Sequence, residues 1–165
     1  MIFNGCINIL VTALLVISPA IICSPSCSNS SGNSPSKEVI TYTYEIVQTY
    51  PHDRNAFTQG LVFEDGFLYE GTGLHGSSTI RKVLPETGEV IQLHELPDRL
   101  FGEGITIYKD NLIQLTWQSG TGFVYDKSTF ELLDEFSYDC EGWGLTTDGE
   151  RLIMSDGSAT IYFRE

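Results

Sequence analysis

The chain has 165 residues, enough for one ordinary domain, with 16 glycines and 12% aromatic residues. Its net charge of −13 excludes the basic surface that nucleic acids and anionic lipid head groups require. Abundant glycine and aromatic residues favour an all-β fold with many tight turns.

The N-terminal segment, residues 1–23, is apolar, with its centre at residues 7–17. This length is typical of a signal peptide, although no Lys or Arg precedes the apolar centre. Lipid attachment at Cys23 or Cys27, simple signal cleavage and a membrane-anchoring helix stay open as alternatives. Residues 24–37 are rich in Ser, Asn, Gly and Pro, which is typical of a flexible tether. We therefore expect an extracytoplasmic protein that is secreted, periplasmic or anchored to a membrane.

Residues 38–165 are predicted to form the folded domain. Its first part, Val39 to Tyr50, alternates well enough to predict a strand. Cys140 is the one cysteine in the repeats described next, so we expect it to be a small, partly buried hydrophobic residue rather than half of a disulfide.

One pattern of short strands occurs three times in this domain. Each copy has a glycine-containing pentapeptide, a hydrophobic strand, a tight turn and a return strand. The pentapeptides are Phe57-Thr58-Gln59-Gly60-Leu61, Phe101-Gly102-Glu103-Gly104-Ile105 and Glu141-Gly142-Trp143-Gly144-Leu145. Their fourth residues, Gly60, Gly104 and Gly144, are separated by 44 and 40 residues. A repeat of roughly 40–45 residues built from short strands is typical of a β-propeller.

The repeats run from Ala56 to about Pro97, from Leu100 to about Tyr138, and from Gly142 to Glu165. This amounts to about two and a half blades, and we expect the strand at Val39–Tyr50 to complete the last blade of a ring. An open propeller would leave an unpaired strand edge, so we expect the chain to be an N-terminal piece of a larger domain.

The first strand of each propeller blade lines the central channel, so equivalent residues of successive blades become neighbours at one rim. Counting from the turns predicts that Glu103 lies opposite Trp117, and the same count pairs Gln59 with Gly71 and Trp143 with Ser155. Alternation with period two places Phe57 and Gln59, and likewise Phe101 and Glu103, on common faces. The predicted site is an aromatic cup that holds one carboxylate and one amide, formed by Glu103, Gln59, Phe57, Phe101, Trp117 and Trp143.

Desolvation in such a cup raises the pKa of a carboxyl group, which suits general acid–base catalysis near neutral pH. The competing interpretation is that the glycines serve turns and the aromatic residues fill the core. The three histidines, His52, His75 and His94, lie in different parts of a repeat, and no set of His, Cys and carboxylate residues has the spacing of metal ligands. We therefore expect no metal and no cofactor.

Five motifs, in this order, resemble the glutamine cyclotransferase family of plants and bacteria: Pro51-His52-Asp53, Ala56-Phe57-Thr58-Gln59-Gly60-Leu61, Glu70-Gly71-Thr72-Gly73-Leu74, Phe101-Gly102-Glu103-Gly104, and Gly142-Trp143-Gly144-Leu145-Thr146-Thr147-Asp148-Gly149. The resemblance implies a five-bladed propeller. It also implies an acyltransferase that converts the N-terminal glutaminyl residue of a peptide to pyroglutamate and releases ammonia, without a catalytic zinc ion.

In this resemblance, the proton-shuttling residue of the family matches Glu103. Its substrate-binding residues match Phe57, Gln59, Phe101, Trp117 and Trp143, and its further pocket residues belong to later blades. The alternative is a non-catalytic propeller that binds a peptide or protein at its rim. A propeller dehydrogenase or sugar hydrolase would require a cofactor site or a second carboxylate, for which Asp53 and Asp156 are the nearest candidates.

Overall fold

The computed structural model describes residues 40–165. The predicted signal or anchoring segment, 1–23, and the predicted tether, 24–37, lie outside the described residues. Within residues 40–165, no helix is long and apolar enough to cross a membrane. By its internal contacts, this part of the chain divides into two units, residues 40–49 and residues 50–165.

Residues 40–49 form no strand, so the strand predicted over Val39–Tyr50 is wrong for the described part of that segment. Its alternating apolar side chains are exposed, among them Tyr42 at 74% and Tyr44 at 78%. Alternation makes a segment suitable for a sheet, but a strand also needs a neighbouring strand to pair its backbone groups. No strand among the described residues pairs with this segment.

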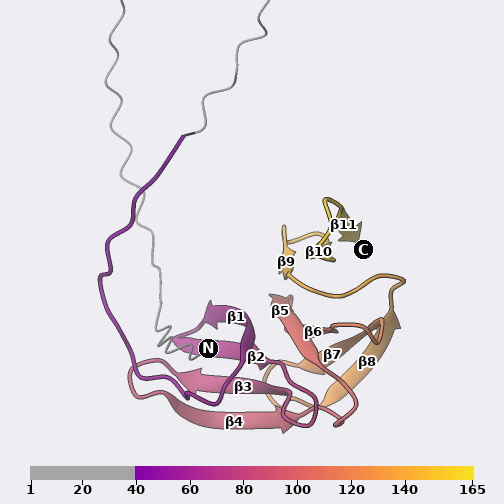
Figure 1. Cartoon of the computed structure of the whole chain (residues 1–165). Coiled ribbons are helices and arrows are strands. Elements are labelled where there is room, and N and C mark those ends of the chain that lie inside the picture. Colours follow the sequence, from indigo (N-terminus) through magenta and orange to yellow (C-terminus); the bar gives the residue numbers. More distant parts are fainter. Residues whose placement is uncertain (1–39) are drawn as a thin grey trace, which may run out of the picture. The chain divides into compact units, whose positions relative to one another are not determined.

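Residues 50–165 form three antiparallel sheets (Figure 1). The first sheet contains β1 (Thr58–Glu64), β2 (Phe67–Thr72), β3 (Thr79–Leu84) and β4 (Glu89–Glu95). The second contains β5 (Gly102–Tyr108), β6 (Asn111–Thr116), β7 (Thr121–Asp126) and β8 (Leu132–Ser137). The third contains β9 (Leu145–Thr147), β10 (Leu152–Ser155) and β11 (Ile161–Arg164).

Each sheet is a meander in which strands adjacent in sequence pair with each other. Each sheet also falls within one predicted repeat, so the phase and the strand order of the three repeats are confirmed. The tight turns fall where glycine and polar residues predict them: the turn between β1 and β2 is Asp65-Gly66, and both residues have positive φ angles. The described chain therefore contains two four-stranded propeller blades and three strands of a third.

The core lies between adjacent sheets rather than within any one of them. One buried cluster combines Tyr69 and Ile80 of the first sheet with Ile105, Leu112 and Phe123 of the second. A smaller cluster joins Leu115 and Tyr138 to Met154 of the third sheet. Because each sheet buries its apolar face against the next, the sheets depend on one another for stability.

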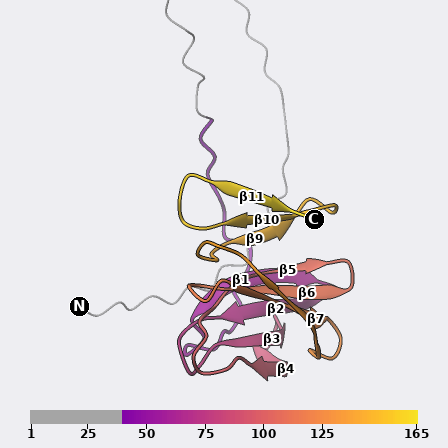
Figure 2. The ribbon, with the colours of Figure 1, turned by 90° about the vertical axis from the view of Figure 1, so that its right-hand side faces the viewer.

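The innermost strands β1, β5 and β9 lie side by side (Figures 1 and 2). A Cβ atom added to Gly60 of β1 would lie 2.5 Å from the backbone N of Ile105 in β5. A Cβ atom added to Gly104 of β5 would lie 2.4 Å from the carbonyl O of Trp143, whose carbonyl also accepts a hydrogen bond from the Gly104 N–H at 2.8 Å. The repeated glycine thus permits direct backbone contact between successive blades. The interpretation that these glycines serve turns is wrong for both positions.

We predict that Gly104→Ala destabilises the fold by about 1–3 kcal/mol, because the new methyl group meets a backbone carbonyl that has no room to move. Urea denaturation measures the effect. The comparison variant is Gly149→Asn, at a glycine that has a positive φ angle of 93° and no atom within 4 Å of an added Cβ, so it reports backbone strain without a steric clash. Equal unfolding midpoints for Gly104→Ala and the unaltered protein would contradict the prediction.

Candidate active site

The predicted site residues gather where the innermost strands begin. Phe57 precedes β1, Phe101 precedes β5 and Trp143 precedes β9, while Trp117 directly follows β6. Gln59 and Glu103 lie at irregularities of β1 and β5: the pairing register shifts between Thr58 and Gly60 and again between Gly102 and Ile105. A β-bulge changes the direction of the side chain that it contains, so the same device positions the amide and the carboxyl group.

The bulges overturn two of the three predicted cross-strand pairs. Trp117 donates its backbone N–H to Phe101, at 3.0 Å, and is therefore not opposite Glu103. Gly71 pairs with Gly60 rather than with Gln59. Counting outward from a turn assumes one residue on each strand at every step, and a bulge breaks this equality. The third pair is confirmed, because the Trp143 N–H donates to the carbonyl O of Ser155 at 3.0 Å.

Aromatic side chains form a continuous wall at this site. Phe101 lies at its centre, with ring centroids 6.3 Å from Phe57 and 5.5 Å from Trp117, in edge-to-face arrangements. Gly73 makes room for this wall, since an added Cβ would lie 2.3 Å from the Phe101 ring and 3.0 Å from Cγ of Gln59. The rings are not core: Phe57 remains 50% exposed, so a bound group can cover it.

Glu103 carries a carboxyl group that no described side chain neutralises, since none of the ion pairs among residues 40–165 includes it. Burial, and to a lesser extent the negative charge of Glu141, together raise the pKa of Glu103 to about 7. At neutral pH this carboxyl group therefore exists in both protonation states and is able to accept and to donate a proton.

Sequence reasoning missed Glu141, which lies beside the wall. It accepts hydrogen bonds from the indole N–H groups of Trp117 and Trp143, at 2.8 Å and 3.0 Å. The repeat held a signal for it: Glu141 occupies the pentapeptide position that Phe57 and Phe101 fill in the first two copies. The third repeat thus has a carboxylate at the position where the first two repeats have an aromatic ring.

The structure also brings His75 to the site, with its ring centroid 5.7 Å from that of Phe101. The other histidines lie elsewhere: His52 contacts the buried Glu70 at 2.8 Å, and His94 packs against Tyr125. Among residues 40–165, no three His, Cys, Asp or Glu side chains are placed to hold one metal ion.

Neither carboxylate named for a hydrolase lies free at the site. Asp53 accepts a hydrogen bond from the backbone N–H of Asn55 at 2.9 Å and forms an ion pair with Arg81 at 2.8 Å. Asp156 accepts hydrogen bonds from Ser158 and from the Tyr162 hydroxyl. These contacts satisfy both groups and lower the pKa of each, so both remain ionised acceptors rather than proton donors.

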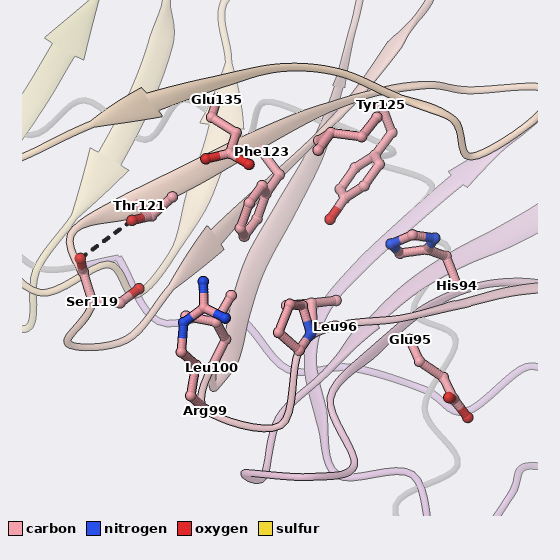
Figure 3. A pocket seen from close by; sticks show the side chains of 12 residues that line it. His94, Glu95, Leu96, Arg99, Leu100, Ser119, Thr121, Phe123, Tyr125 and Glu135 are labelled. Atoms are coloured by element: carbon pink, nitrogen blue, oxygen red, sulfur yellow. Dashed lines mark hydrogen bonds between the residues drawn. The ribbon is translucent and has the colours of Figure 1, made fainter.

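A cavity of about 640 Å³ lies away from this site, between the first and second sheets (Figure 3). Arg99, Phe123 and Tyr125 are among the residues that line it, and the Thr121 hydroxyl donates to the carbonyl O of Ser119 at its edge. It contains none of the predicted site residues. We assign the candidate active site to the region around Glu103, because polar and aromatic groups from three repeats converge there.

Comparison with solved structures first defines the class of fold. The chain matches the WD40 β-propeller domain of Doa1 with a TM-score of 0.56 at 15% identity, over 72% of this chain and 40% of that one. At this level of identity the match concerns the fold alone, and the chain has the β-propeller fold.

Sequence comparison then defines the family. A family model described as glutamine cyclotransferase matches residues 16–165. The chain is 41% identical over 139 residues to a glutaminyl-peptide cyclotransferase of Arabidopsis thaliana, covering 83% of this chain and 43% of that protein. It also matches the crystal structure of Myxococcus xanthus glutaminyl cyclase, with a TM-score of 0.66 and 34% identity, over 72% of this chain and 50% of that one. The chain belongs to the glutamine cyclotransferase family, which confirms the resemblance, and it spans half or less of the length of these two relatives.

We predict that protonation of Glu103 makes the fold more stable as the pH falls from about 7 to about 4.5. In this range the folded protein binds a proton at Glu103 that the unfolded chain has released, so the free energy of unfolding rises as the pH falls. Glu103→Gln removes this titration and should be more stable than the unaltered protein at pH 8. Urea denaturation at several pH values measures both, and a difference between the two proteins that does not vary with pH would contradict the assignment.

Proposed function

We propose that the protein is a glutaminyl-peptide cyclotransferase, which converts an N-terminal glutaminyl residue of a peptide or protein to pyroglutamate and releases ammonia. The observation that carries the proposal is the Glu103 carboxyl group, with its pKa raised to about 7, beside a partly exposed aromatic wall. The names of the relatives in Arabidopsis and Myxococcus point to the same chemistry.

The substrate supplies both reacting groups in this reaction. Its α-amine attacks the carbon of its own γ-carboxamide, a new C–N bond closes the ring, and the bond to the carboxamide nitrogen breaks. Glu103 accepts a proton from the attacking amine and delivers it to the departing nitrogen, which leaves as ammonia. A pKa near 7 suits both steps, because the group must be ionised for the first and protonated for the second.

The remaining site residues bind and orient the substrate. The aromatic rings surround the aliphatic part of the glutaminyl side chain and hold it folded back toward the α-amine; these rings belong to Phe57, Phe101, Trp117 and Trp143. Ring closure then becomes a reaction between groups that are already positioned. Gln59, which packs beside Phe101 over Gly73, donates or accepts a hydrogen bond with the substrate amide. The aromatic wall also keeps water from competing with the amine.

We predict that Glu103→Gln lowers kcat/KM for a peptide with N-terminal glutamine by about 10²–10⁴-fold, the usual contribution of a general acid–base group. Ammonia release and the mass of the product measure the reaction. The matched control is Glu89→Gln, which removes the same charge from an exposed position on β4. Undiminished cyclisation by Glu103→Gln would exclude Glu103 from the chemistry. A peptide that binds at the rim of every variant without being cyclised would favour the non-catalytic propeller instead.

We also propose that the protein acts outside the cytoplasm. The apolar centre at residues 7–17 and the tether composition of residues 24–37 support this location. The acidic net charge argues against nucleic acid as a partner.

We predict that the mature protein isolated from its source lacks residues 7–17, and N-terminal sequencing together with intact mass tests this. An added lipid mass on Cys23 or Cys27 would identify the membrane tether, and an unmodified shortened chain would identify simple cleavage. A mature chain that retains residues 7–17 and fractionates with the membrane would instead identify an anchoring helix and would contradict cleavage.

A further inference from the structure

Glu141 makes more hydrogen bonds to side chains of the site than any of the six predicted residues does. Its Oε2 atom accepts the indole N–H groups of Trp117 and Trp143, and its Oε1 atom accepts the side-chain N–H of Gln118 at 3.1 Å. Trp117 follows β6 of the second sheet, whereas Trp143 precedes β9 of the third. One carboxylate therefore joins the aromatic walls that two neighbouring blades contribute.

This connection matters most for Trp143, whose side chain is 46% exposed. A ring with so much free surface is held in place by few packing contacts, and here the hydrogen bond to Glu141 defines its orientation together with contact from Gly157, where an added Cβ would lie 2.6 Å from the ring. An indole N–H is only a donor, so Glu141 is a suitable partner for both rings.

The hydrogen bonds also determine the charge of Glu141. Donation from Trp143, Gln118 and Trp117 lowers the pKa of Glu141, so it stays ionised throughout the range in which Glu103 titrates. We propose that Glu141 is a positioning residue, which fixes the two tryptophan rings at the mouth of the site and holds a constant negative charge near Glu103. This inference rests on the proposed function, because positioning matters only if Glu103 moves a proton.

The titratable groups facing this pair come from two segments, one after β8 and one after β10. Tyr138, which follows β8, has its pKa raised by burial and stays neutral, and Cys140 lies beside it. Asp156, which follows β10, is an ionised carboxylate, and its negative charge slightly opposes the lowering of the Glu141 pKa. No Lys or Arg among the described residues forms an ion pair with Glu103 or Glu141. The negative charge of Glu141 is therefore not cancelled locally.

Two substitutions separate the two roles of Glu141. Glu141→Gln keeps an oxygen that can accept both indole N–H groups but removes the charge, and Glu141→Ala removes both. The matched control is Asp139→Asn, which removes a charge from an exposed side chain two residues away that makes no hydrogen bond to either ring. All variants are prepared in the full-length protein.

Two NMR measurements on these variants need no substrate. The ¹⁵N–¹H signals of the two indole groups, assigned with Trp117→Phe and Trp143→Phe, report the hydrogen bonds. The carboxyl ¹³C signal of Glu103, assigned with Glu103→Gln, reports its titration. We expect Glu141→Gln to keep both indole signals and to lower the titration midpoint of Glu103 by on the order of half to one pH unit, because burial remains the larger cause of its raised pKa.

We expect Glu141→Ala to shift both indole signals toward those of free indole in water, and Asp139→Asn to change neither signal nor midpoint. The proposal is overturned if the Glu103 midpoint is the same in Glu141→Gln as in the unaltered protein, or if the indole signals are unchanged in Glu141→Ala.

Activity measurements distinguish this proposal from the proposed function. With a peptide that the protein cyclises, the acidic limb of the kcat/KM profile moves to lower pH in Glu141→Gln, in parallel with the NMR midpoint. KM rises in Glu141→Ala, which no longer holds the two rings. If the NMR changes occur as expected but neither the unaltered protein nor any variant cyclises a peptide, the hydrogen bonds and the charge assigned to Glu141 stand and the proposed function fails. If the peptide is cyclised and Glu141→Gln leaves the limb in place, the positioning role fails alone.

Discussion

Direct backbone contact between the innermost strands is the constraint on which the rest of this structure depends. Gly60 lies against the backbone of Gly104 and Ile105 in the second repeat. Gly104 lies against the backbone of Trp143, Gly144 and Leu145 in the third repeat. A side chain at these positions would push the strands apart and weaken the packing of the core that the sheets share. Gly102 adds a further contact of the same kind, with an added Cβ 2.7 Å from the carbonyl O of Thr72.

This contact aligns the repeats and thereby creates the site. Because equivalent glycines meet, the residues beside them meet too: Gln59, Glu103 and Trp143 share one repeat position, and Phe57, Phe101 and Glu141 share another. Two positions repeated three times supply an amide, two carboxylates and three aromatic rings. A glycine on each side of Glu103 therefore serves packing, and the carboxyl group lies at the site as a consequence of that packing.

The two carboxylates at the site differ in environment and hence in role. Glu103 is partly buried without a described cation beside it, and its pKa is raised to about 7. Glu141 accepts three hydrogen bonds and its pKa is lowered. Separation of this kind between neighbouring acids allows one to carry a proton while the other remains charged. Two of the aromatic side chains contribute to the second effect, since Trp117 and Trp143 donate hydrogen bonds to Glu141.

The sequence by itself determined the all-β class, the three repeats and their phase, the turns, and the residues that meet at the site, because glycine positions and alternation are local properties that recur in each copy. It did not determine the bulges at Gln59 and Glu103, which changed the expected pairing with Gly71 and Trp117, because a bulge depends on how the neighbouring sheet packs. Nor did it reveal Glu141, since a bond from Trp117 of one blade to Glu141 of the next exists only after the blades have packed. The alternating segment at residues 40–49 failed as a strand for the same reason: alternation is local, whereas the partner that completes a strand is supplied by tertiary structure alone.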